Sequence, residues 1–204
     1  MRSKPLALTA AALAALVAIP ALGSLPAQAA TKAEQARAQR ANVYVQGDSL
    51  TVGAGPIIKQ HLGRSVHSVS VDAQVGRFTA TGMNRLAHSA DARRAAVWVV
   101  ALGTNDGPDP AALRHHVRRS LALAGPQRHV IWLTVERPGN YAGVNRMLRK
   151  LDSVDDRLHV VDWAREVHQN PGLIGGDGVH GTAHGYQVRG AMIAREALAL
   201  AQQG

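Results

Sequence analysis

Residues 95–102 have the sequence AAVWVVAL, in which every side chain is apolar. The polar segment Gly103-Thr104-Asn105-Asp106 follows at once. A strand that is apolar at every position needs cover on both faces, which is the environment of an interior strand in a parallel sheet. This stretch therefore predicts the centre of an α/β fold, with a polar loop at the carboxyl end of the strand.

Strand-like and helix-like segments alternate along the rest of the chain. The predicted strands are Val43–Gln46, Val66–Val71, Ala96–Leu102, Val130–Val135 and Leu158–Trp163. The predicted helices are Val52–Leu62, Thr79–His88, Ala111–Ala124, Tyr141–Leu151 and His184–Ala201. Such alternation is typical of a mostly parallel sheet covered by helices on both faces. We expect one α/β domain over residues 42–204, with a five-stranded sheet.

The N-terminal residues 1–29 have the pattern of a secretory signal peptide. Two basic residues precede an apolar stretch from Leu6 to Leu25, and Ala27-Gln28-Ala29 supplies small residues for cleavage. An uncleaved anchor is the alternative, since about 20 apolar residues can span a bilayer. We expect a secreted, extracytoplasmic protein with no stable membrane insertion after cleavage. Residues 30–41 are expected to be a linker or a loose leading helix.

Charge and composition restrict the partners of this protein. The formal net charge is +9, which favours anionic surroundings such as cell-wall polymers. Aromatic residues make up 3% of the chain, too few for base-stacking platforms, so no nucleic-acid partner is expected. The chain has no cysteine, so an exported domain must be held together by packing alone. We expect a monomer.

The tetrapeptide Gly47-Asp48-Ser49-Leu50 follows the first predicted strand and contains a candidate nucleophile. A serine at the start of a helix lies among free backbone N–H groups, which can stabilise a developing oxyanion. Its hydroxyl needs a base that removes its proton before it can attack. The alternative role for Ser49 is that of a helix N-cap, a common use of serine.

His180 is the preferred base, because Asp177 precedes it in the segment Asp177-Gly178-Val179-His180. The glycine allows a turn that brings the carboxylate to the imidazole, where it would fix the ring tautomer. A turn aspartate beside a surface histidine is the alternative. His184 is a second candidate base, but it lacks a carboxylate at this spacing.

Asn105 and Gly76 are candidate donors to an oxyanion. The Asn105 amide follows the most apolar strand, and loss of one such donor typically raises a barrier by about 2.7–4 kcal/mol. Gly76 follows the second predicted strand and allows close approach of its backbone N–H. A turn asparagine and a loop glycine are the alternative interpretations.

In this order, these segments resemble the SGNH (GDSL) hydrolase superfamily over nearly all of the chain beyond the signal segment. Ser49 matches the family nucleophile, and Asp177 with His180 matches the family's Asp-x-x-His pair. The oxyanion hole would comprise the N–H groups of Ser49 and Gly76 and the side-chain amide of Asn105. The resemblance implies a flavodoxin-like three-layer α/β/α fold, no metal requirement, and acyl chemistry through an acyl-serine.

A closer likeness is to the extracytoplasmic SGNH domain of membrane-bound peptidoglycan O-acetyltransferases. It rests on the segments Val71–Arg77, Val161–Trp163 and Asp177–His180 with Gly185. The sequence has no multi-helix membrane domain that would supply acyl groups, which favours hydrolysis unless a partner protein provides them.

The leading expectation is a serine esterase that removes small acyl groups, acetyl first among them, from a carbohydrate or another polar ester. An O-acetyltransferase acting on cell-wall glycan and a non-catalytic glycan-binding module are the alternatives. Ten histidines raise the possibility of a metal site, with His180, His184 and Asp177 as ligands. No His-Glu-x-x-His segment is present, and we expect no metal or other cofactor.

Overall fold

A five-stranded sheet forms the centre of the computed structural model, which describes residues 30–204; the proposed signal peptide lies outside the described residues. The strands are β1 (Asn42–Gly47), β2 (Ser68–Ala73), β3 (Val97–Ala101), β4 (His129–Leu133) and β5 (Leu158–Val161). Their order is β2-β1-β3-β4-β5, and every neighbouring pair is parallel. The predicted α/β class is confirmed, and the sheet is entirely parallel.

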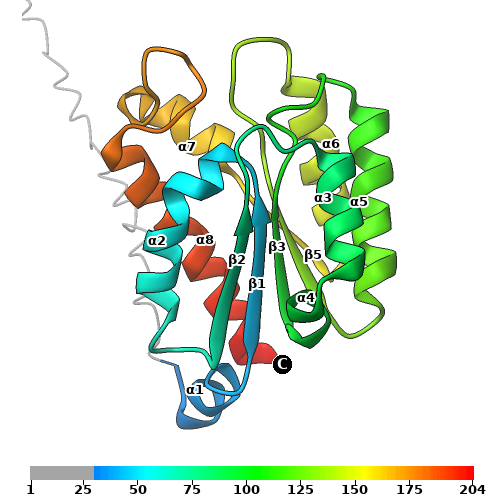
Figure 1. The fold of residues 1–204 in the computed structure, drawn as a ribbon, viewed down its shortest axis with the longest axis vertical. Coiled ribbons are helices and arrows are strands. Elements are labelled where there is room, and N and C mark those ends of the chain that lie inside the picture. Colours follow the sequence, from blue (N-terminus) through cyan, green and yellow to red (C-terminus); the bar gives the residue numbers. More distant parts are fainter. Residues whose placement is uncertain (1–29) are drawn as a thin grey trace, which may run out of the picture.

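Helices cover both faces of the sheet, which gives three layers (Figure 1). One layer holds α1, α2, α7 and α8, and the other holds α3, α4, α5 and α6. The helices are α1 (Lys32–Ala38), α2 (Ser49–Leu62), α3 (Thr79–His88), α4 (Ala90–Arg94), α5 (Pro110–Ala124), α6 (Ala142–Asp152), α7 (Trp163–Gln169) and α8 (Ala183–Gln203). A short 3-10 helix, Pro171–Leu173, precedes α8.

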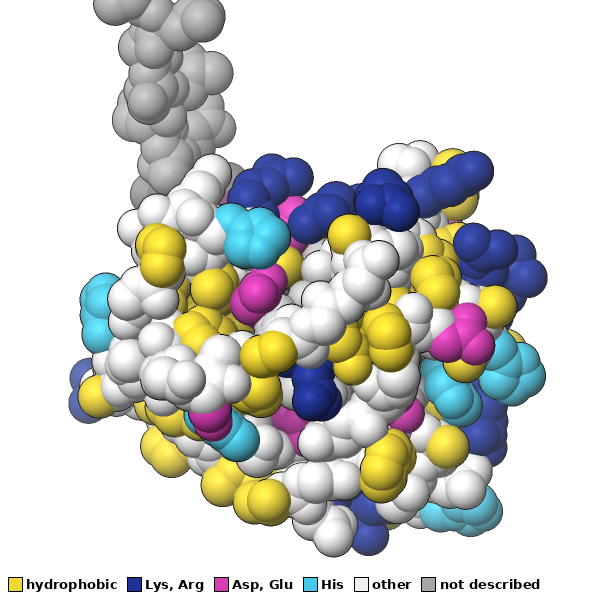
Figure 2. Space-filling model, turned by 90° about the horizontal axis from the view of Figure 1, so that it is seen from above, with side chains coloured by type: hydrophobic (Ala, Val, Ile, Leu, Met, Phe, Trp, Pro, Cys, Tyr) yellow, Lys and Arg dark blue, Asp and Glu magenta, His cyan; other side chains and the backbone are white. Residues whose placement is uncertain are grey.

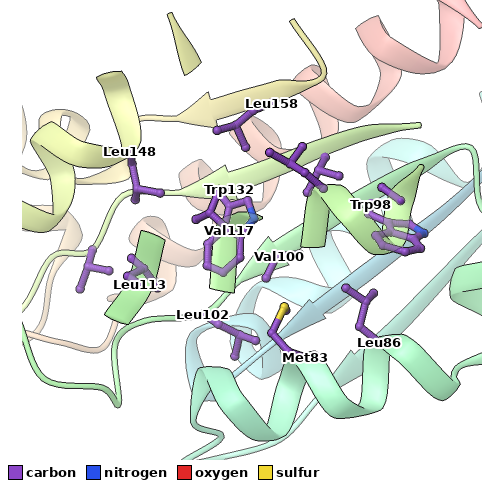
Figure 3. Close-up of a cluster of buried hydrophobic side chains, with 14 of the residues drawn as sticks. Met83, Leu86, Trp98, Val100, Leu102, Leu113, Val117, Trp132, Leu148 and Leu158 are labelled. Atoms are coloured by element: carbon purple, nitrogen blue, oxygen red, sulfur yellow. The ribbon is translucent and has the colours of Figure 1, made fainter. Parts of the chain in front are cut away.

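The β3 side chains alternate between two cores, as the all-apolar sequence of this strand predicts. Trp98 and Val100 enter the core beneath α3, α5 and α6, whereas Val97 and Val99 enter the core beneath α2 and α8. Figure 3 shows the first core, which Trp132 enters from the neighbouring strand β4. The sheet is therefore buried on both faces at its centre.

Several boundaries differ from the sequence-based expectation. The second strand begins at Ser68, because the N–H of Val66 donates to the Leu62 carbonyl and extends the end of α2. The last strand ends at Val161, because the Asp162 side chain accepts the N–H of Arg165 and caps α7. Helices α4 and α7 were not predicted.

Helix α1 occupies most of the segment expected to be a linker or a loose helix. Thr31 and Glu34 form a capping box at its start, and Ala38 is buried. The helix packs against α8 and joins the core cluster of that layer. The leading-helix interpretation therefore describes residues 32–38.

The order of the strands positions the loops that matter for function. The chain leaves β1 to form β2 on one side and then β3 on the other side. In open α/β sheets, ligands bind at the carboxyl edge where the strand order reverses in this way. That edge lies at the top of Figure 1 and faces the viewer in Figure 2. Between residues 30 and 204, no helix combines the length and apolar character needed to span a bilayer.

Candidate active site

Ser49 is the first residue of α2, directly after the carboxyl end of β1. The Asp48 side chain caps the helix by accepting the N–H of Leu50 at 3.0 Å. The turn is so tight that a Cβ on Gly47 would lie 1.9 Å from the Thr51 hydroxyl oxygen. The local sequence therefore places the Ser49 hydroxyl at the point where the strand order reverses.

The loop between the 3-10 helix and α8 carries His180 and Asp177. One carboxylate oxygen of Asp177 accepts the backbone N–H groups of Val179 and His180, both at 2.9 Å. Gly178 has φ +69°, a conformation that side chains disfavour, and the N–H of Gly175 closes the loop on the His180 carbonyl at 2.8 Å. These bonds fix the loop independently of any ligand.

The two segments meet at the sheet edge. Ser49 Oγ lies 3.0 Å from His180 Nε2, and His180 Nδ1 lies 2.7 Å from the second carboxylate oxygen of Asp177. A neutral ring that donates from Nδ1 to the carboxylate has Nε2 free to accept the serine proton. Of the two candidate bases, His180 is the one in contact with Ser49.

Hydrogen bonds keep Asp177 charged. The bond from His180 is the largest effect that lowers its pKa, to about 2, and the N–H groups of Val179 and His180 add to it. The side chains of His180 and Asp177 are 48% and 52% exposed, so the pair sits at the open surface of the protein. The carboxylate is therefore ionised at any pH at which the imidazole can act as a base.

The candidate oxyanion donors lie at the start of α2 and on two loops at this edge. Within residues 30–204, no protein atom accepts the backbone N–H of Ser49 or of Gly76. Gly76 has φ +71° in an exposed turn. The Asn105 side-chain nitrogen donates to the Arg77 carbonyl at 3.2 Å and to an Asp48 carboxylate oxygen at 3.4 Å. Asn105 is thereby tied both to the Gly76 loop and to the residue before Ser49.

Arg77 is a buried part of the framework around the site. Its side chain is 2% exposed, and its guanidinium holds the Asp72 carboxylate at 2.7 Å and the Asp72 carbonyl at 2.6 Å. The Arg77 side chain therefore holds both ends of the loop that contains Gly76 together.

Comparison with solved structures places this arrangement in a known fold, although no family model and no curated protein sequence matches the chain. The catalytic domain of peptidoglycan O-acetyltransferase A from Streptococcus pneumoniae is 22% identical, with TM-score 0.66 over 80% of this chain and 96% of that chain. A lipase/acylhydrolase from Enterococcus faecalis is 20% identical, with TM-score 0.67 over 78% and 96%. A family 3 carbohydrate esterase from Clostridium thermocellum is 13% identical, with TM-score 0.63 over 79% and 99%. The chain has the SGNH hydrolase fold.

Several residues that support the loops of this SGNH fold were not identified from sequence. Asp106 accepts the N–H and the hydroxyl of Thr79 and so ties the Asn105 loop to the start of α3. The Tyr141 hydroxyl donates to the Asp106 carbonyl at 2.6 Å, and the Arg137 guanidinium donates to the Thr104 carbonyl. Each is an ordinary loop residue in sequence, and only its long-range partner reveals its role.

Gly185 controls the fit of the His180 loop on α8. A Cβ at this position would lie 1.9 Å from the Leu173 carbonyl oxygen, which also accepts the N–H of Thr182 at 2.9 Å. We expect Gly185→Ala to lower the free energy of unfolding by about 1–3 kcal/mol, because the backbone contact cannot yield without moving the loop. Urea denaturation measures the effect. Gly172→Ala, in the 3-10 helix before the loop, is the matched control, since a Cβ there meets no atom within 4 Å. Equal stability of both variants would contradict the expectation.

Proposed function

We propose that this protein is a secreted serine esterase of the SGNH type, which hydrolyses small acyl esters, acetyl esters foremost, through an acyl-serine intermediate. The observation that carries the proposal is the unbroken series of hydrogen bonds from Ser49 through His180 to Asp177. The likeness of the fold to esterases, a lipase and an O-acetyltransferase domain supports the same class of chemistry. Export rests on the N-terminal apolar segment.

The reaction begins when Ser49 Oγ attacks the ester carbonyl carbon and its proton passes to His180 Nε2. The tetrahedral intermediate carries a negative oxygen, which accepts hydrogen bonds from the N–H groups of Ser49 and Gly76. The Asn105 amide is the third donor, and one of its N–H groups exchanges the longer of its two bonds, 3.4 Å to Asp48, for a bond to this oxygen. His180 then protonates the alcohol oxygen, the bond from the carbonyl carbon to that oxygen breaks, and the acyl group remains on Ser49. Asp177 stabilises the imidazolium throughout.

Hydrolysis completes the cycle. Water attacks the acyl-serine carbonyl carbon while His180 Nε2 takes a proton from it, and the same donors stabilise the second tetrahedral intermediate. The bond to Ser49 Oγ breaks as His180 returns its proton to that oxygen, which releases the carboxylic acid. No metal or other cofactor has a role in this scheme.

The surroundings of Ser49 suit a small acyl group on a large alcohol. Val75 and Phe78, in and beside the Gly76 loop, are 71% and 56% exposed, and Val52 lies one helical turn after Ser49 with 47% exposure. These apolar side chains offer the acyl group a surface rather than a deep tunnel. The exposure of His180 leaves the alcohol side open to a bulky group such as a glycan.

Transfer of the acyl group to a glycan is the second candidate, favoured by the likeness to a peptidoglycan O-acetyltransferase domain. In that case a glycan hydroxyl replaces water in the second half of the reaction. Lys and Arg side chains gather along one rim of the site face (Figure 2), which suits an anionic wall polymer as the surrounding surface. Accumulation of acetylated glycan when donor and acceptor are supplied together distinguishes transfer from hydrolysis.

Covalent labelling of Ser49 tests the proposal directly. A small sulfonyl fluoride is expected to modify this serine alone and to abolish hydrolysis of p-nitrophenyl acetate in step with the modification, because His180 activates only this hydroxyl. Peptide mass mapping identifies the labelled residue. Ser49→Ala should remain unlabelled, whereas Ser153→Ala, which alters an exposed serine elsewhere, should label normally. Labelling at another serine would reject the assignment.

A further inference from the structure

Arg137, on the loop after β4, has a guanidinium without a counter-ion. Its side chain is half-buried, yet none of the ion pairs formed within residues 30–204 involves it. Arg77 and Arg149, which are also partly or wholly withdrawn from solvent, each pair with an aspartate. A charge withdrawn from water is unfavourable unless it is compensated. Arg137 therefore has the charge to bind an anion that the described part of the chain does not supply.

Two other arginines withdrawn from solvent lack an aspartate, but neither is available to a ligand. Arg128 is half-buried, and its guanidinium donates to three backbone carbonyls. Arg189 is 3% exposed and lies over the Trp163 ring, beneath the surface. Arg137 differs from both because its hydrogen bonds are not used up and part of its side chain reaches the surface.

Most of the hydrogen-bonding capacity of Arg137 is unused. Its Nη1 atom donates to the Thr104 carbonyl, and its Nε atom is buried without a partner in the described residues. The Nη2 atom has no partner there either, but it is not among the buried atoms. The Tyr141 ring, whose centroid lies 5.8 Å from the central guanidinium carbon, supports the group from one side. The open end of the guanidinium can therefore donate two parallel N–H bonds to a planar carboxylate.

The order of the strands places Arg137 close to the nucleophile. Along the sheet, the segments after β2, β1, β3 and β4 carry Gly76, Ser49, Asn105 and Arg137 in that order. Neighbouring strands lie about 4.8 Å apart, so the ends of β1 and β4 are about 10 Å apart. The bond to the Thr104 carbonyl draws the Arg137 side chain back over the β3 loop, toward Ser49. A substituent on the sugar whose ester Ser49 attacks can therefore reach the guanidinium.

The Arg137 loop also touches the turn that carries His180. The Pro138 ring packs against Gly178, where a Cβ would lie 2.9 Å from Pro138 Cγ. In the proposed reaction His180 protonates the alcohol oxygen, so the alcohol leaves on this side of the site. Two of the three apolar side chains offered to the acyl group lie in or beside the Gly76 loop, on the other side of the nucleophile. An anion bound by Arg137 therefore belongs to the alcohol.

We propose that Arg137 is a specificity-determining residue, whose guanidinium binds a carboxylate on the alcohol part of the ester. The substrate class is then an O-acylated acidic sugar, such as an acetylated uronic acid. This inference rests on the proposed esterase function and adds to it the charge of the alcohol. The carboxylate supplies the counter-ion that Arg137 lacks, and the Lys and Arg side chains along the rim of the site face (Figure 2) suit a polymer of such acids.

Paired substrates that differ by one group test the inference. Methyl glucuronoside and methyl glucoside, each acetylated at one and the same ring hydroxyl, differ only in the carboxylate. Over the set of mono-acetyl isomers, we expect the parent to hydrolyse at least one glucuronoside with kcat/KM about 10–100-fold above that of its glucoside counterpart. Release of acetic acid measures both rates.

Arg137→Gln should abolish this preference, because it removes the charge and the fork of N–H donors. Any movement of the Thr104 loop in this variant affects both substrates alike, so the ratio of the two kcat/KM values reports the lost charge. Arg64→Gln is the control and should keep the ratio of the parent, since Arg64 is an exposed arginine after the end of α2, at the opposite edge of the sheet.

Binding to the Ser49→Ala protein gives a readout that does not depend on turnover. NMR chemical shifts should show tighter binding of methyl glucuronoside than of methyl glucoside. The double variant with Ser49→Ala and Arg137→Gln should bind the two glycosides equally.

The outcomes are distinct. A parent that hydrolyses p-nitrophenyl acetate, but neither prefers the glucuronoside esters nor binds the glucuronoside more tightly, overturns the role of Arg137, and this result needs no variant at position 137. A preference that persists in Arg137→Gln overturns it as well. Tighter binding of the glucuronoside without Ser49-dependent hydrolysis of any ester overturns the proposed function instead and leaves a carboxylate-binding site.

Discussion

Replacement of Ser49 by alanine is expected to lower kcat/KM for an acetyl ester by about 10⁴–10⁶-fold, because no other group at the site can form the acyl intermediate. The hydroxyl contributes to the chemistry through its bond to His180, and the residue belongs to neither large core cluster. The free energy of unfolding should therefore stay within about 0.5 kcal/mol of the parent. Initial rates with p-nitrophenyl acetate and urea denaturation measure the two effects.

Ser153→Ala is the control for the loss of a hydroxyl, since Ser153 caps the end of α6 on the surface. It should keep full activity. Activity of Ser49→Ala within tenfold of the parent would remove Ser49 from the mechanism, and a large loss of stability would leave its chemical role unproven by this variant.

Replacement of Asp177 by asparagine is expected to lower kcat/KM by about 10²–10⁴-fold. The new side-chain oxygen can still accept the N–H groups of Val179 and His180, so the loop keeps its shape. The new NH₂ group, however, donates to His180 Nδ1 and leaves the ring proton on Nε2. A ring in that tautomer cannot accept the proton of Ser49.

The pH dependence of this loss follows from the pKa of Asp177. That pKa is lowered to about 2, so the carboxylate is ionised in the parent from pH 5 to pH 9. The ratio of parent to Asp177→Asn activity should then be constant between pH 8 and pH 9, where a carboxylate is ionised and an imidazole is neutral. Asp156→Asn is the control, because Asp156 is an exposed aspartate in the turn before β5. This variant should keep the activity of the parent. A tenfold change of this ratio between pH 8 and pH 9 would mean that a group other than Asp177 and His180 controls the loss.

The layers of this fold were predictable because its strands are apolar on both faces. The side chains of β3 are apolar on both faces of the strand, and the structure places this strand between two cores. The half-exposed edge strand β2 has a weaker pattern, and its predicted start is two residues early. Helix α7 was missed because Trp163 and Val161 continue the apolar pattern of β5, whereas the cap at Asp162 depends on a side-chain hydrogen bond.

The residues of the candidate site also fall into those that could be predicted from the sequence and those that could not. Ser49, Asn105 and His180 were identified because their residue types and their places after strands are chemically distinctive. Arg77 and Arg189 were not, because an arginine in a loop or on a helix usually lies in solvent. Both are buried, and the Arg77 guanidinium pairs with the carboxylate of Asp72 on β2. Only the packing of the folded chain shows that these two arginines are buried.

The contact between Ser49 and His180 joins positions 131 residues apart, and it depends on α8 lying against α2. Contacts of such long range are slow to form, since the intervening chain must first be ordered. Catalysis by this chain would therefore appear only after its final helix has docked. During refolding from urea, recovery of turnover should lag behind the return of helical circular dichroism. The time at which ester hydrolysis returns then measures when α8 docks against α2, the last step of folding.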